Sequence, residues 1–158
     1  MVIKNIFLIS SLSLILFGCG GGSSSAVAVS TCSPTVTLSS SASSIYESAA
    51  GTLTITATLS CLKSFRPDVL VSIGTAGTAT EGVDYSSISD ITIFGGNTSG
   101  TTTFNPTSDN AYEQSNETAI LSITGVSGMS ATESGTQSVT ITINEYALNS
   151  GTTLSYNS

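Results

Sequence analysis

The run Leu53-Thr54-Ile55-Thr56-Ala57-Thr58-Leu59 decides the fold class of this chain. Apolar residues occupy every odd position and threonine every even position, which is the period-two pattern of a strand with one buried face and one wet face. Val139-Thr140-Ile141-Thr142-Ile143 repeats the pattern near the other end of the sequence. The two runs predict a sheet whose outer surface is covered by threonine.

Between these runs, short β-branched segments alternate with clusters of Gly, Ser, Asn and Asp, and no stretch shows a helical apolar period. Residues 95–100 are typical of a hairpin connection. Seven short strands predict an all-β domain with the architecture of a β-sandwich. The expected strands are Thr35–Ser39, Thr52–Ser60, Val69–Ile73, Asp90–Phe94, Thr101–Asn105, Thr118–Thr124 and Gln137–Asn144.

The first residues have the three parts of an export signal. Lys4 is the only positive charge, an apolar run from Ile6 to Phe17 follows, and a small residue precedes Cys19. Leu16-Phe17-Gly18-Cys19 resembles the lipobox of bacterial lipoproteins, although Phe17 is bulkier than the residue that most lipoboxes carry. The resemblance implies a signal peptide over residues 1–18 and acyl chains on Cys19 that anchor the protein to a membrane. An ordinary secretory signal with a chance cysteine is the alternative.

The remaining chain divides into three parts. Residues 19–33 begin with the lipidated cysteine and continue as a Gly/Ser-rich stretch, which predicts a flexible tether. Residues 34–146 contain every expected strand and predict one β-sandwich domain, and residues 147–158 form a polar C-terminal tail. Gly20 resembles the sorting signal of outer-membrane lipoproteins, so we expect a cell-envelope protein that is lipid-anchored in the outer membrane, on its periplasmic or its exterior side.

Charge and composition narrow the possible partners and chemistry. After Cys19, ten acidic residues stand against only two basic ones, Lys63 and Arg66, which gives a net charge of about −8. Such a surface repels nucleic acid, so the partners we expect are the membrane and another envelope or matrix protein. The chain has no histidine, which excludes most hydrolase triads and zinc sites.

Cys32 and Cys61 remain once the first cysteine carries lipid, in an exported and disulfide-permissive setting. Each is in phase with the inward-facing residues of its neighbouring strand, and antiparallel pairing brings the start of one strand to the end of the other. The sequence therefore predicts a Cys32–Cys61 disulfide. Two free buried thiols are the alternative.

Several acidic residues fall where strands should end. In a sandwich, alternate connections gather at the same end, and carboxylates collected there repel one another unless a cation lies between them. Ca²⁺ takes six to eight oxygen ligands from such loops, so calcium is the natural candidate. The alternative is that acidic residues populate loops because loops are wet.

Three segments together resemble the Calx-beta domain family. They are Ser44-Ile45-Tyr46-Glu47-Ser48, the specific run Gly77-Thr78-Ala79-Thr80-Glu81-Gly82-Val83-Asp84-Tyr85, and Asp109-Asn110-Ala111-Tyr112-Glu113 with Asn116-Glu117-Thr118. The resemblance covers nearly all of Pro34 to Tyr146. It implies a seven-stranded, immunoglobulin-like sandwich whose loops at one end can bind calcium, a fold often found in cell-surface, adhesion and matrix proteins.

The resemblance also implies a ligand set. Its members are the acidic positions that match the family's calcium ligands, together with the acid that closes the last strand: Glu47, Asp84, Asp109, Glu113 and Glu145. Ser108 stands where an aspartate is common, and Asn144-Glu145-Tyr146 replaces a richer acidic cluster, so we expect weak binding. Asp84-Tyr85 also fits a plain structural role, in which the carboxylate fixes a turn and the ring packs on the core.

These observations favour a non-enzymatic, calcium-binding or calcium-stabilised binding or adhesion module on the cell envelope. A calcium-independent structural or adhesin domain with a vestigial ion site is the second reading. A third is an enzyme that uses paired carboxylates such as Asp109 and Glu113. The absence of tryptophan and the position of these acids in loops argue against the third.

Overall fold

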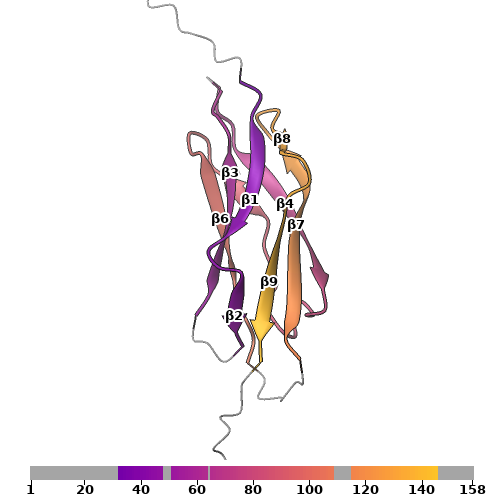
Figure 1. Ribbon diagram of the computed structural model, residues 1–158. Helices are drawn as coiled ribbons and strands as arrows, with labels where there is room; N and C mark the ends of the chain where they lie inside the picture. The colour runs from indigo at the N-terminus through magenta and orange to yellow at the C-terminus, as the bar shows by residue number, and fades with distance from the viewer. Residues whose placement is uncertain (1–31, 48–50, 64, 109–114, 146–158) are drawn as a thin grey trace, which may run out of the picture.

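A computed structural model describes residues 32–47, 51–63, 65–108 and 115–145. These residues form two β-sheets packed face to face, with no helix among them (Figure 1). One sheet has the strand order β6-β3-β1-β8, with β6 Ser99–Phe104, β3 Leu53–Leu59, β1 Thr35–Ser40 and β8 Thr132–Glu133. The other has the order β2-β9-β7-β4-β5, with β2 Ser44–Tyr46, β9 Ser138–Asn144, β7 Glu117–Ser127, β4 Val69–Gly77 and β5 Ile91–Ile93.

The all-β, immunoglobulin-like sandwich expected from the sequence is confirmed, but the expected number of strands is wrong. All seven expected strands are present, and β2 and β8 make nine in the described residues. Both additional strands are very short and pair in parallel, β2 with β9 and β8 with β1. Pairs of two or three residues carry too little alternation to be detected in a sequence.

The core fills the space between the two sheets with inward-facing aliphatic residues. In β3 the burial alternates as the sequence predicts, with Leu53, Ile55, Ala57 and Leu59 buried. The described residues bury no polar or charged side chain completely, so hydrophobic burial is the main source of stability. Among them there is also no helix long and apolar enough to cross a membrane.

The chain changes sheets between β1 and β2. β1 pairs antiparallel with β3, and Ser41 continues this contact by donating its backbone N–H to the carbonyl of Thr54. Two residues later, the carbonyl of Ser43 accepts a hydrogen bond from the backbone N–H of Thr142 in the opposite sheet. This crossing places the residue that follows β2 beside the end of β9.

Cys32 and Cys61 form a disulfide, so the prediction from their spacing is confirmed and the free-thiol alternative is wrong. Their Cα atoms lie 6.5 Å apart, and 29 positions separate them in the sequence. Cys32 precedes β1 and Cys61 follows β3, whose antiparallel register pairs Val36 with Leu59. The bond closes the end of the sandwich at which the N-terminal part of the chain enters; we call it the disulfide end.

Candidate functional site

The opposite end of the sandwich carries the candidate site, and we call it the distal end. There β2, β4, β6 and β9 finish and β7 begins, as the registers Tyr46↔Asn144, Gly77↔Ala119 and Leu53↔Phe104 show (Figure 1). Three of the five predicted ligands, Glu47, Asp84 and Glu145, lie in its connections. The other two, Asp109 and Glu113, lie outside the described residues.

Glu47 and Glu145 follow adjacent parallel strands. The backbone N–H of Glu47 donates to the carbonyl of Asn144 at 3.1 Å, which places position 47 next to the end of β9. The Asn116 side chain joins the same group, accepting from the backbone N–H of Glu145 at 3.2 Å and donating to Oδ1 of Asn144 at 3.1 Å. Both glutamates are half-buried, and Oε2 of Glu145 is shielded from solvent.

Asp84 lies on the next connection of the distal end, where it fixes a tight loop. Its Oδ2 accepts the backbone N–H of Thr80 at 2.6 Å, and its own backbone N–H donates to the Thr80 carbonyl at 2.9 Å. Gly82 between them has φ +84°, a conformation that L side chains adopt only with strain. The carbonyl of Asp84 accepts from the backbone N–H of Thr107, which ties this loop to the connection after β6.

Tyr85 anchors the same loop in the core. Its ring is 1% exposed and stacks on Phe104 with the centroids 4.8 Å apart. Burial raises the pKa of the Tyr85 hydroxyl above its usual value, the nearby Glu81 and Asp84 charges add to the rise, and a hydrogen bond with Thr75 opposes it. The structural role expected for Asp84-Tyr85 is therefore confirmed: the carboxylate fixes a turn and the ring packs on the core.

Glu81 is a loop-forming residue that the sequence did not single out. Its Oε2 accepts the Thr75 hydroxyl and its Oε1 accepts the backbone N–H of Ile88, both at 2.8 Å. The carboxylate thereby joins the end of β4 to the segment before β5. An isolated bridge between Glu81 and Tyr85 belongs to the same loop. The contacts of the Glu81 carboxylate could not be predicted, because only folding brings Thr75 and the Ile88 amide to it.

Three other acids use their carboxylates on backbone amides away from the distal end. Asp90 accepts the backbone N–H of Ile73 at 3.0 Å and the Ser72 hydroxyl at 3.1 Å, at the β-bulge of β4. Asp68 accepts the N–H of Gly95, and Glu133 accepts that of Gln137. These contacts satisfy backbone donors, so the three acids have structural roles.

The described acids do not by themselves complete a metal site. In residues 32–47, 51–63, 65–108 and 115–145, no three Asp, Glu or Cys side chains come together to hold an ion. Asp84 already uses one oxygen on Thr80. Since calcium takes six to eight oxygens, a site here needs ligands from the connection that contains Asp109 and Glu113.

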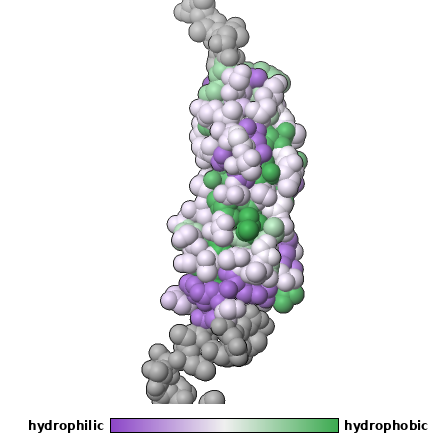
Figure 2. Space-filling view, turned by 45° about the vertical axis from the view of Figure 1, so that its right-hand side comes forward, coloured by the Kyte–Doolittle hydropathy of each residue, from purple (hydrophilic) through white to green (hydrophobic). Residues whose placement is uncertain are grey.

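The surface of the distal end is nonetheless strongly hydrophilic. Figure 2 shows a band of hydrophilic residues across this end. Glu117, at the start of β7, adds a further carboxylate to those of Glu47, Glu81, Asp84 and Glu145. No lysine or arginine of the chain lies in the described connections of this end. The local charge is therefore uniformly negative.

Comparison with known proteins identifies the fold of the chain. The solved structure of an apo-form Calx CBD1 domain matches with a TM-score of 0.58 and 14% sequence identity, over 72% of this chain and 98% of that one. No protein-family model matches, and no curated protein matches. The chain thus has a Calx-beta-like fold.

Proposed function

We propose that this chain is a bacterial envelope lipoprotein, anchored through acyl chains on Cys19, whose sandwich is a non-enzymatic binding or adhesion module with a weak calcium site at the distal end. The observation that supports the calcium site best is the convergence of Glu47, Asp84 and Glu145 on one end, from three connections far apart in the sequence. In the proposed site, Asp109 and Glu113 complete this set.

Electrostatics gives the reason for an ion at this position. Like charges on neighbouring loops repel one another, and the chain places no basic residue in the described part of the distal end to offset them. A bound Ca²⁺ supplies positive charge and accepts several oxygens at once. Glu47 and Glu145 are held by β2 and β9, and Asp84 by its turn, so the protein positions three of the five predicted ligands before binding.

A second candidate function, a calcium-independent structural or adhesin domain, has an observation of its own in favour. Asp84 makes its turn without any ion, because its carboxylate accepts the amide of Thr80. An acid that first served a metal site can be kept for this contact alone. The two candidates differ in one measurable property, which is the response of stability to calcium.

Thermal unfolding of the full chain with and without calcium tests the ion site. For a Kd near 1 mM, 10 mM calcium stabilises the fold by about 1.4 kcal/mol, which raises Tm by about 5 °C for a domain of this size. The Asp84→Asn variant should lose this shift. Asp90→Asn is the matched control, because Asp90 also accepts a backbone amide but lies away from the distal end; its Tm should fall while its calcium shift remains.

Equal Tm values for the wild type with calcium and with matched sodium chloride would remove the calcium site and leave the structural role. The anchor is tested separately, by mass spectrometry of the protein extracted from bacterial membranes. Acyl chains on Cys19 are expected, and an unmodified or secreted product would contradict the anchor. Protease treatment of intact cells then shows which side of the envelope the domain faces.

A further inference from the structure

The disulfide end carries a surface that the proposed calcium module does not explain. Phe65 is 82% exposed, Phe94 64% and Leu70 42%, and the two basic residues Lys63 and Arg66 flank Phe65 in the sequence. We call these five residues the basic-aromatic surface. Two highly exposed phenylalanines are costly in water and are typical of a contact surface.

Two connections are fastened together beneath this surface. The backbone N–H of Gly95 donates to Oδ1 of Asp68 at 2.7 Å, and a Cβ at position 95 would overlap the carbonyl oxygen of Arg66. Within the first connection, Nε of Arg66 donates to the carbonyl of Lys63 at 3.2 Å. The turn after β5 therefore packs directly on the segment before β4, and the exposed side chains are presented by a fixed backbone.

The register of β4 and β5 places Phe94 and Leu70 on the same outward face. Val69 pairs with Ile93 and Leu70 with Thr92, and the buried residues are Val69 and Ile93. Leu70 and the residue after Ile93 are therefore diagonal neighbours on the solvent side of the sheet, a separation of about 7–8 Å in regular pairing. The solvent side of β4 and the residue that follows β5 thus present Leu70 and Phe94 together.

Charge along the domain is strongly asymmetric. Lys63 and Arg66 are the only basic residues after Cys19, and both lie at the disulfide end. Five acids, Glu47, Glu81, Asp84, Glu117 and Glu145, lie at the opposite end. Asp68 and Glu133 also lie at the disulfide end and balance the two basic charges there. An anionic surface therefore repels the distal end and not the disulfide end, which selects one orientation of the domain.

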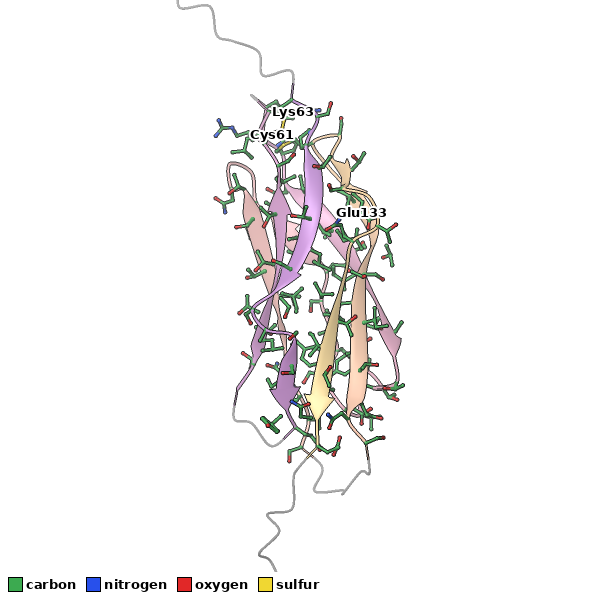
Figure 3. All side chains as sticks on the ribbon, in the orientation of Figure 1. Cys61, Lys63 and Glu133 are labelled. Carbon is green, nitrogen blue, oxygen red and sulfur yellow. A yellow bond between two sulfur atoms is a disulfide. The ribbon has the colours of Figure 1, made fainter. Side chains whose placement is uncertain are left out.

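The basic-aromatic surface also lies where the proposed anchor joins the fold. Figure 3 shows Cys61 and Lys63 together at the end of the sandwich where β1 begins. The disulfide fixes Cys32 to Cys61, two residues before Lys63. Only 13 positions separate Cys19 from Cys32, a distance of at most about 45 Å even when fully extended.

We propose that the basic-aromatic surface docks on the anionic lipid surface of the membrane that holds the anchor, with Phe65 and Phe94 in the interface and Lys63 and Arg66 against phosphate headgroups. The inference rests on the lipid anchor of the proposed function. Apolar side chains next to basic ones bind such interfaces, and each basic residue near the surface contributes about a fivefold change in the binding constant. Docking directs the distal end away from the bilayer.

Tryptophan scanning tests the docking, because the chain contains no tryptophan. The full lipidated chain with Phe65→Trp or Phe94→Trp is reconstituted into phosphatidylglycerol-containing vesicles with brominated acyl chains, which quench only nearby indoles. Tyr46→Trp is the matched control, since Tyr46 is 58% exposed but lies at the distal end. Quenching and a blue shift are expected at positions 65 and 94 and not at position 46.

Charge removal supplies the second arm. Lys63→Gln with Arg66→Gln should lower the docked-to-undocked ratio by about 30-fold, and so should vesicles of phosphatidylcholine alone. Equal quenching at all three positions, or none at positions 65 and 94 in a chain shown by mass spectrometry to be acylated, would overturn the docking and leave the anchor intact. If mass spectrometry shows no acyl chain, the anchor is refuted, and the same tryptophan variants are mixed with anionic vesicles instead. Quenching at positions 65 and 94 then supports membrane binding by the basic-aromatic surface without an anchor, and no quenching overturns it.

Discussion

Removing the Cys32–Cys61 disulfide should destabilise the sandwich by about 3.5 kcal/mol. The bond closes a loop of 29 positions, and the cost follows from the loop-closure entropy that the cross-link removes from the unfolded chain. Both thiols are only half-buried, so the loss of packing on truncation is small beside this value. The corresponding fall in Tm is about 15 °C for a domain of this size.

Urea unfolding of the Cys32→Ala/Cys61→Ala variant measures this cost, in a Cys19→Ser background that leaves no third thiol to exchange. The reduced protein with both cysteines in place is the control, because it lacks the cross-link but keeps the side chains. The free energies of the two should agree within about 0.5 kcal/mol. The m-value should rise for both, because an unlinked unfolded chain exposes more surface.

A loss of less than about 1 kcal/mol in both proteins would refute the loop-entropy reasoning. A large loss in the double variant with a small loss on reduction would assign the stability to the packing of the sulfurs. Unchanged stability in the double variant and in the reduced protein would mean that the antiparallel pairing of β1 with β3 stabilises the disulfide end without the cross-link.

Two further predictions concern the loop that positions Asp84. Gly77→Ala should lower the free energy of unfolding in urea by at least about 2 kcal/mol, because Gly77 has φ +117° and a Cβ there overlaps the Thr118 carbonyl oxygen. The control is Gly51→Ala, where a Cβ has nothing within 4 Å and stability should change by less than about 0.5 kcal/mol. Equal losses in the two variants would contradict this prediction. The raised pKa of buried Tyr85 means that the unfolded chain loses this proton first as pH rises, so stability is full below about pH 10 and is lost as pH rises through the folded-state pKa. Tyr85→Phe should abolish that part of the alkaline loss in denaturant titrations, and an unchanged pH profile would contradict the assignment.

The sequence predicts the long, alternating strands well because their burial follows directly from residue type. Leu53 to Leu59 is buried at every odd position, and Ile141 and Ile143 are buried in β9. The hairpin expected over residues 95–100 is wrong, because β5 and β6 lie in different sheets and the connection crosses from one sheet to the other. The antiparallel pairing of β1 with β3 agrees with expectation, as the alternating strands do. In each case the local pattern and the tertiary environment favour the same structure.

Strand ends and irregular pairings could not be predicted in the same way. β4 continues through Ser72-Ile73-Gly74-Thr75-Ala76-Gly77, residues of mostly weak strand propensity, because β7 pairs with it across a bulge. That bulge is held by Asp90, 17 positions away in the sequence from Ile73. A single sequence contains no signal for such a contact.

The candidate site also has a part that could be predicted from the sequence and a part that could not. Convergence of Glu47, Asp84 and Glu145 on one end follows from the topology of a sandwich and was predictable. The structural tasks of Glu81 and Asp90 were not, because each depends on a backbone amide brought close only by folding. The sequence therefore predicts where the acidic residues gather. It does not distinguish the acids that stabilise loops by accepting backbone amides from those that could bind an ion.

The most direct test of the calcium site is a titration of the isotopically labelled full chain with calcium, followed residue by residue by two-dimensional amide NMR. The account predicts shifts concentrated at the distal end, in the amides of Glu47, Asp84, Asn116 and Glu145, saturating in the millimolar range. Amides beside Cys61 at the disulfide end should stay in place. No saturable shift up to 10 mM calcium, or shifts centred on Asp90 and Glu133, would contradict a calcium site at the distal end.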